Sequence, residues 1–154
     1  MKISFDLDDT LIPAKRGDFE VEKRTFLQRI LGIELLRKGT ASVFQQLIAQ
    51  GHTVGIYTTS YRSVFTIKLM FWSYGIRPHF VINEKTNRRE LGKHNIRSSK
   101  YPPTFGVDWH IDDSQGVAME GERLDFEVLV LKRNEVSWEQ KVLGQIDRSY
   151  DHEK

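Results

Sequence analysis

The sequence contains no cysteine among its 154 residues. This absence excludes disulfide frameworks, thiolate nucleophiles and thiolate zinc sites, so any metal site must use oxygen or imidazole ligands. The chain also lacks an apolar stretch long enough to span a bilayer, and its first residues, MKISFDLDD, become acidic before the apolar region of a secretory signal could develop. We therefore expect a cytoplasmic protein without a membrane partner.

The chain also lacks an excess of charge of one sign. Its 23 basic and 21 acidic residues leave a net charge of +2, which is too mild to indicate nucleic acid binding by itself. Hydrophobic residues make up 39% and charged residues 29% of the chain, as is typical of a globular domain. We expect a single domain over residues 1–147, followed by a polar tail over residues 148–154.

Short apolar runs alternate with amphipathic segments along the chain. The runs are rich in Val, Ile, Leu and Phe and predict strands at residues 2–5, 53–60, 79–82, 107–114 and 126–131. The amphipathic segments predict helices at residues 22–32, 40–51, 60–75 and 137–146. This alternation predicts a doubly wound α/β fold, with a mostly parallel five-stranded sheet and helices on both faces.

Capping residues and apolar patterns refine two of these helices. Thr40 is expected as the N-cap of one helix and Gly51 as its stop, while Ser60 is expected to cap the next helix. That next helix is apolar almost all round, as expected for a helix packed between a sheet and another surface. Its aromatic residues Phe65, Phe71 and Trp72 are expected in the core, with a dimer face as the alternative.

Acidic residues gather directly after two of the predicted strands. Asp6, Asp8 and Asp9 follow the first strand, and Asp112 and Asp113 end the fourth. The carboxyl ends of parallel strands lie at one edge of a sheet, where ligands bind. Crowded carboxylates repel one another and are costly to bury. We therefore expect Mg²⁺, which prefers oxygen ligands and is usually held by one or two carboxylates together with substrate phosphate.

A calcium-binding loop is the competing use of this acidic spacing. In a twelve-residue loop that begins at Asp6, the sixth position is Leu11 where glycine is required. The twelfth position is Gly17 where a bidentate glutamate is required. The sequence therefore does not fit a calcium loop.

Three of these segments together resemble a known family. DLDDT at the first strand, YTTS at the second and DDS at the fourth resemble the first, second and fourth motifs of the haloacid dehalogenase superfamily, in the right order. The resemblance implies a Rossmann-like core and, in most members, Mg²⁺-dependent phosphoryl transfer through a phosphoaspartate. The intervals between the motifs are too short for a large cap domain. Residues 13–38 are expected to overhang the open site.

The resemblance also implies a role for each motif residue. Asp6 would be the nucleophile, and Asp8 the general acid that protonates the leaving oxygen and later activates water. Asp6, Asp112 and the backbone carbonyl of Asp8 would bind Mg²⁺, with Asp113 supporting the metal shell. Thr58 would donate a hydrogen bond to the transferring phosphoryl oxygens.

The lysine of the third motif has two candidates. Lys100, within SSKYPP, is preferred, and Lys93 is the alternative. Both lie in a basic stretch, residues 85–100, which is expected to be a solvated loop; the other interpretation is that it gathers a phosphate-rich or nucleic-acid substrate. His110 is expected to be a packed core histidine, and Arg62 either solvated or in reach of a substrate anion.

The expected function is that of a Mg²⁺-dependent phosphatase acting on a phosphorylated small molecule or macromolecule. A phosphotransferase, or a receiver-like phosphoacceptor module that gathers acids and a lysine around Mg²⁺, is the first alternative. A non-catalytic binding protein on the same fold is the second. A nucleic acid partner is not favoured, and a homodimer is left open.

Overall fold

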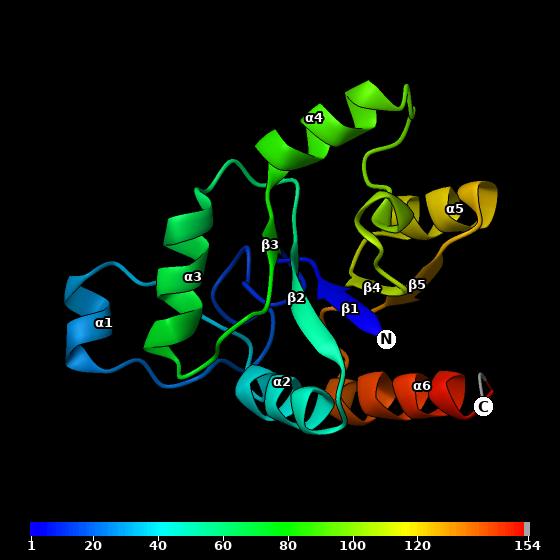
Figure 1. Ribbon diagram of the computed structural model, residues 1–154. Helices are drawn as coiled ribbons and strands as arrows, with labels where there is room; N and C mark the ends of the chain where they lie inside the picture. Colours follow the sequence, from blue (N-terminus) through cyan, green and yellow to red (C-terminus); the bar gives the residue numbers. More distant parts are fainter. Residues whose placement is uncertain (153–154) are drawn as a thin grey trace.

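The computed structural model describes residues 1–152, which form a five-stranded sheet flanked by helices (Figure 1). All strand pairs are parallel and the strand order is β3-β2-β1-β4-β5. This topology confirms the doubly wound α/β fold expected from the sequence. The strands are β1 (Lys2–Phe5), β2 (Thr53–Tyr57), β3 (Val81–Ile82), β4 (Trp109–Asp112) and β5 (Glu127–Val130).

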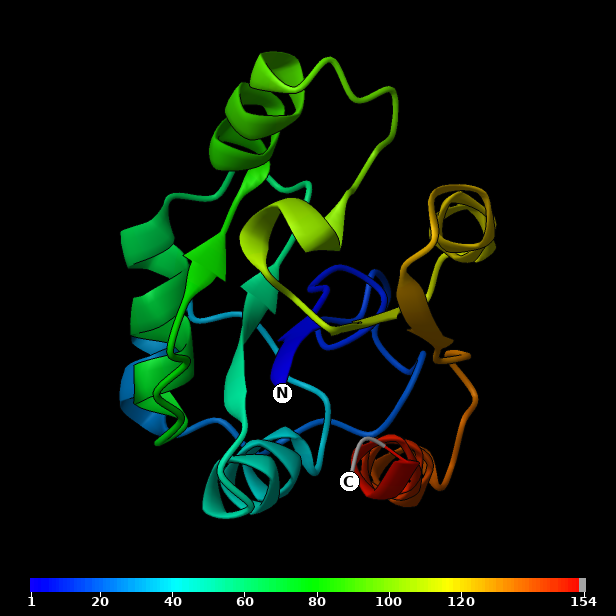
Figure 2. The ribbon, with the colours of Figure 1, turned by 45° about the vertical axis from the view of Figure 1, so that its right-hand side comes forward.

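Within residues 1–152, six α-helices and one short 3-10 helix connect and follow the strands. They are α1 (Phe26–Ile30), α2 (Thr40–Ala49), α3 (Val64–Ser73), α4 (Glu84–Lys93), η1 (Pro102–Phe105), α5 (Gln115–Leu124) and α6 (Trp138–His152). Helices α2 and α6 lie against each other, as Figure 2 shows at the bottom of the view. Residues 148–152, assigned to a polar tail, continue α6, and residues 153–154 lie outside the described residues.

The two faces of the sheet differ in chemistry because alternate strand residues point to opposite faces. One face carries the main apolar core, to which α2, α3 and α6 contribute. There the rings of Phe5, Phe44 and Phe71 pack in a row, with centroids 5.0 and 5.7 Å apart. The alternate positions of β1 and β4, Ser4 and His110, point to the opposite face and are buried there. That second face is therefore partly polar.

Two of the expected helix caps are wrong. The N-cap of α2 is Gly39, in a left-handed conformation with φ 90°, and the Thr40 hydroxyl donates to the Arg37 carbonyl instead, at 2.7 Å. Ser63, not Ser60, caps α3 through its Oγ, which accepts from the Thr66 amide at 3.0 Å. The cap of α3 lies later than expected because the chain continues as a loop for several residues after β2 before this helix begins. The stop at Gly51, with φ 86°, is confirmed.

The basic stretch expected to be a loop contains helix α4. Asn83 caps this helix through its Oδ1, which accepts from the Thr86 amide. Basic residues of α4 form ion pairs with Glu84 and Glu90 within the same helix. Part of the positive charge of the stretch is therefore neutralised locally, and these pairs stabilise a helix that has little apolar surface.

Helix α3 is covered on one side only. Its buried side packs on the sheet and includes Phe71, which is in the core as expected, but Phe65 and Trp72 are 66% and 49% exposed. The expectation for these two residues was wrong, because no other element within residues 1–152 covers the outer side of this helix. Within residues 1–152, no helix combines the length and the apolar character that a membrane span requires.

Two glycines give a matched test of how tightly the fold is packed. A Cβ on Gly55 in β2 would lie 2.5 Å from the Phe80 carbonyl oxygen, whereas a Cβ on Gly144 in α6 would meet nothing within 4 Å. We expect Gly55→Ala to lower the free energy of unfolding by about 1–3 kcal/mol through overpacking. Gly144→Ala should raise it by about 0.5–1 kcal/mol. Urea denaturation measures both, and an unchanged stability of Gly55→Ala would contradict this packing.

Candidate active site

The loop after β1 is anchored by apolar side chains that flank its acids. Leu7 and Leu11 are fully buried, and the Leu7 carbonyl accepts from the amides of Leu11 and Ile12, both at 2.8 Å. Asp9 occupies the turn with φ 64°, a left-handed conformation that aspartate tolerates. The Asp6 amide donates to the Ile111 carbonyl at 2.8 Å. The loop thus fixes Asp6 beside the end of β4.

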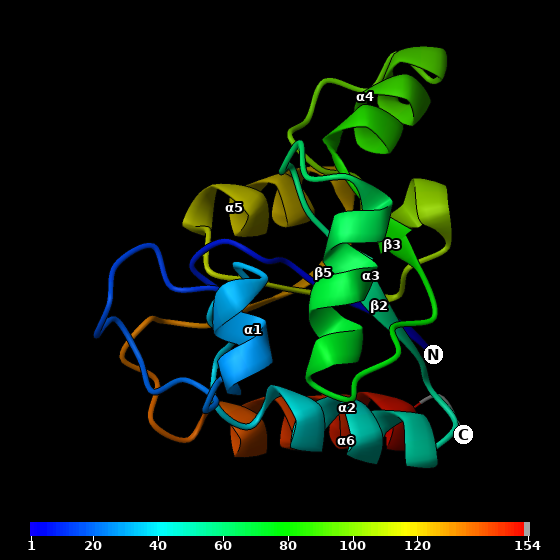
Figure 3. The same ribbon diagram turned by 90° about the vertical axis from the view of Figure 1, so that its left-hand side faces the viewer.

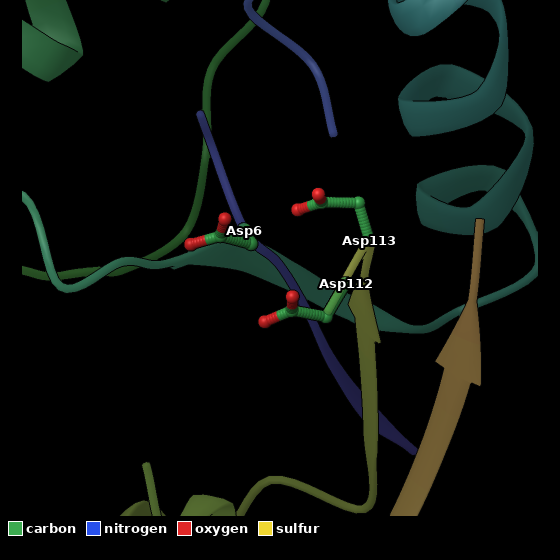
Figure 4. A group of neighbouring side chains, drawn as sticks. All are labelled: Asp6, Asp112 and Asp113. Carbon is green, nitrogen blue, oxygen red and sulfur yellow. The ribbon is translucent and has the colours of Figure 1, made fainter. Parts of the chain in front are cut away.

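Three carboxylates meet at this edge of the sheet. Asp6, Asp112 and Asp113 each offer an oxygen, and these oxygens lie within 4.8 Å of one another (Figure 4). Asp6 and Asp112 are buried. The Thr10 hydroxyl, from the loop after β1, donates to Oδ1 of Asp113 at 3.2 Å. The strand ends therefore bring together the three carboxylates that the sequence predicts at the metal site.

A buried ammonium group bridges two of these acids. Nζ of Lys100 lies 2.7 Å from Oδ1 of Asp6 and 2.6 Å from Oδ2 of Asp112, and the side chain is only 3% exposed. Lys93, the alternative, lies in the last turn of α4, where it is 58% exposed and pairs with Glu90 at 3.0 Å. The structure thus brings Lys100, and not Lys93, to the acids.

The loop around Lys100 is held by three elements. The amide and hydroxyl of Ser99 donate to the Glu120 carboxylate of α5, and the Ser99 carbonyl accepts from Asn87 of α4 at 2.8 Å. The Tyr101 amide donates to the Tyr57 hydroxyl of β2 at 2.9 Å. Helix η1 and a left-handed glycine then return the chain to β4. This compact return explains how Lys100 meets Asp112 across so short a sequence interval.

His110 belongs to the same buried group. Its Nε2 lies 2.9 Å from Oδ2 of Asp112 and 3.2 Å from Nζ of Lys100, and its Nδ1 lies 2.8 Å from the Ser4 hydroxyl. It is a buried core histidine, as the sequence predicts, but its contact with the acids was not foreseen. The sequence does contain a signal for this contact. Ser4 and Asp6 are two residues apart in and directly after β1, as His110 and Asp112 are in β4, so all four side chains point to one face of the sheet.

The pKa values in this cluster follow from burial and from the pairing of charges. Burial, together with the charge of Asp112, raises the pKa of Asp6 to about 6, although Lys100 opposes this shift. Burial would also raise the pKa of Asp112, but hydrogen bonds from His110 and Lys100 and their charges bring it below its usual range. Burial and the charge of Lys100 lower the pKa of His110 to about 4, so the imidazole is neutral at pH 7.

The charges of the cluster do not balance. One ammonium faces three carboxylates, and the pKa of Asp113 is raised by burial and by the nearby Asp112 charge. The pKa of Lys100 is raised because the charges of Asp6 and Asp112 outweigh the effect of its burial. The site is short of positive charge, which is the electrostatic condition under which a divalent cation binds to carboxylate oxygens.

Asp8 lies apart from the three acids and binds an arginine. Its two carboxylate oxygens each accept from Arg62 at 2.9 Å, and its side chain is 52% exposed. Arg62 also makes two bonds of 2.7 Å to Glu34, from the segment expected to overhang the site. The sequence offered no local signal for this group, because Glu34 and Asp8 lie 28 and 54 residues from Arg62.

Thr58 directly follows β2 at the same edge of the sheet. It is buried, and its amide donates to the Ile82 carbonyl at 2.9 Å. Its Oγ1 accepts from the Ser60 amide at 3.1 Å. Because a hydroxyl also has a proton to donate, Thr58 is suited to bind an oxygen atom of an anion at this edge.

Comparisons with known proteins add no family to this description. No protein-family model matches the chain, and no curated protein matches it significantly. Any functional interpretation therefore depends on the site residues themselves and on their arrangement.

The raised pKa of Asp6 predicts a dependence of stability on pH. Between pH values of about 4 and 6 the folded carboxyl keeps a proton that the unfolded chain has lost, so Asp6 lowers the free energy of unfolding as the pH rises. His110 acts in the opposite direction over the same interval, because its pKa is lowered on folding. The wild-type protein should therefore show a shallow pH dependence here.

Asp6→Asn separates the two contributions. The stability of this variant relative to wild type should increase from pH 4 to pH 6, by on the order of 2 kcal/mol. Urea denaturation at a series of pH values measures the difference, and Asp9→Asn, on the turn of the same loop and paired with Arg133, serves as control. A constant difference between Asp6→Asn and wild type would contradict the raised pKa.

Proposed function

We propose that this chain is a Mg²⁺-dependent phosphomonoester hydrolase of the haloacid dehalogenase type that forms an aspartyl-phosphate on Asp6. The observation that carries the proposal is the buried ammonium of Lys100 between the carboxylates of Asp6 and Asp112 at the carboxyl edge of a parallel sheet. A carboxylate held in this way stays oriented and ionised at neutral pH, as a nucleophile must be.

The acids present fit Mg²⁺. Their donor atoms are hard carboxylate oxygens from Asp6, Asp112 and Asp113, and the net negative charge of the cluster remains after Lys100 is counted. When bound, Mg²⁺ would offset the charge of the substrate phosphate and of these acids. Thr10 and the Ser114 amide, which donate to Asp113 and Asp112, would keep the carboxylates oriented.

The chain's own groups account for both halves of the reaction. An oxygen of Asp6 attacks phosphorus, the bond between phosphorus and the leaving oxygen breaks, and that oxygen takes a proton from the Asp8 carboxyl. Asp8 then takes a proton from water, whose oxygen attacks phosphorus and releases phosphate and the Asp6 carboxylate. Lys100 and the Thr58 hydroxyl stabilise the negative charge on the transferring phosphoryl group.

The position of Asp8 supports a second candidate function. In the described conformation its carboxylate is engaged by Arg62, so it must leave this ion pair to protonate a leaving group. If it stays there, phosphoaspartate lacks its base and persists, as in a phosphotransferase or a phosphoacceptor signalling module. The hydrolase is preferred because half of the Asp8 side chain is exposed, so water can solvate its carboxylate when it leaves, and because Arg62 keeps its ion pair with Glu34.

The first test of the proposal is phosphate release. Wild-type protein with Mg²⁺ should release phosphate from at least one member of a panel of sugar phosphates, nucleotides and phosphorylated oligonucleotides. Chelation of the metal should abolish release, and Asp6→Asn should lower kcat by at least about a thousandfold because the nucleophile is lost. Asp9→Asn should retain activity, since Asp9 lies on the turn and pairs with Arg133.

Full activity of Asp6→Asn, or release that does not depend on a divalent cation, would refute the assignment. Absence of release from every compound, together with stable labelling of Asp6 by acetyl phosphate, would move the assignment to the phosphoacceptor candidate.

The role of Asp8 is tested by trapping the intermediate. If Asp8 activates water, Asp8→Asn should accumulate phosphoaspartate and slow its breakdown by about 10²–10⁴-fold, the usual contribution of general acid–base catalysis. The lifetime of Asp6 labelled with radioactive acetyl phosphate measures this rate in wild type, Asp8→Asn and Asp9→Asn. Equal lifetimes in all three proteins would exclude Asp8 as the base.

A further inference from the structure

A large apolar surface lies on the outer side of two neighbouring helices. Helices α1 and α3 are side by side, because Nε2 of Gln28 donates to the carbonyl and hydroxyl oxygens of Ser73, and Figure 3 views both from outside. Six large side chains of these helices are 39–78% exposed. This surface, the α1–α3 face, consists of Phe26, Leu27, Ile30, Phe65, Leu69 and Trp72.

The exposed side chains of α3 form a stripe opposite its buried side. Ile67, Met70 and Phe71 pack into the main core, while Phe65 and Leu69, four residues apart, remain outside with Trp72. A helix that is apolar on all sides is normally covered on all sides. The outer side of α3 therefore has the composition of a buried surface without anything in the described chain to bury it.

The area of the face matches one half of a protein interface. Its six side chains expose about 700 Å², from typical side-chain areas, which exceeds the largest apolar patch on most monomers. A standard interface buries about 800 Å² per partner. Leu31 and Tyr61, 59% and 71% exposed, would extend the surface at its margins. The area is thus sufficient for a stable association without any further element.

We infer that the α1–α3 face is the interface of a symmetric homodimer. A two-fold axis places a surface against an identical copy of itself, so a charge close to the axis would face the same charge on the other copy, which is unfavourable. Helices α1 and α3 carry no acid, and their only basic residues are Arg29 and Lys68. Aromatic enrichment with few charges is the composition of interface cores. A second copy of this chain provides the matching surface.

Charge also argues against the other occupants. A strongly acidic partner would be matched by a basic surface, and an anionic membrane is usually bound by a cluster of four to eight basic residues beside the apolar ones. Two basic side chains among six large apolar ones fit neither case. The inference does not depend on the proposed phosphatase activity, since it uses none of the site residues.

The mass in solution tests the inference. Light scattering with size-exclusion chromatography should give twice the chain mass of 18.0 kDa for wild type at high concentration. Phe65→Glu and Trp72→Glu should raise the dissociation constant at least about tenfold, because a charge would be buried in the interface. Met119→Glu, which changes a side chain 68% exposed on α5, should leave the dimer unchanged.

Tryptophan fluorescence locates the contact. Trp109 and Trp138 are already buried in the single chain, whereas Trp72 is half exposed, so dimer formation should shift the emission of Trp72 to shorter wavelength. Trp72→Phe should keep the dimer and abolish the concentration-dependent shift. Circular dichroism and urea denaturation establish that the glutamate variants fold.

Three results would overturn the inference. These are a mass of one chain at every concentration, a dimer that Phe65→Glu leaves intact, or a monomer that binds vesicles of anionic lipid through the same residues.

Discussion

The ion pairs of Lys100 with Asp6 and Asp112 are the interaction on which the arrangement of the site depends. All three groups are buried, and an unpaired charge at such a position would be far too costly to keep. Removing Lys100 would leave two buried carboxylates without their shared counter-charge. The surrounding hydrogen bonds serve this arrangement: Asn87, Glu120 and Tyr57 hold the backbone around Lys100, and His110 and Ser114 hold Asp112.

The elements of the fold could be predicted from the sequence because strands and helices are short-range patterns. The apolar runs mark all five strands, and the acids at the ends of β1 and β4 follow from the parallel topology. The same alternation that places Ile3 and Phe5 in the main core places Ser4 and Asp6 on the opposite face. The sequence thus indicates which carboxylates share an edge, but not which ones meet.

The parts that sequence patterns could not predict depend on long-range contacts. The sequence alone leaves Lys93 as an alternative to Lys100, whereas in the structure Lys93 lies on the surface of α4 and pairs with Glu90. The contact of Asp8 with Arg62 joins two loops, and Glu34 comes from a third segment. The N-cap of α3 could not be predicted for a local reason: several hydroxyl residues precede this helix, and only the backbone geometry selects Ser63.

Helix α3 connects the site to the outer surface of the molecule. Its cap, Ser63, directly follows Arg62, which binds both Asp8 and Glu34, and Glu34 in turn accepts through its carbonyl from the Tyr74 hydroxyl at the other end of α3. Both ends of the helix are therefore tied to the segment that carries α1 and Glu34. A partner that covers α1 and α3 together would restrict the movement of Glu34 relative to Arg62. If Asp8 acts as the proposed general acid, it must first separate from Arg62, so a partner bound at the α1–α3 face would influence the proposed reaction through the contacts of Arg62 with Glu34 and Asp8.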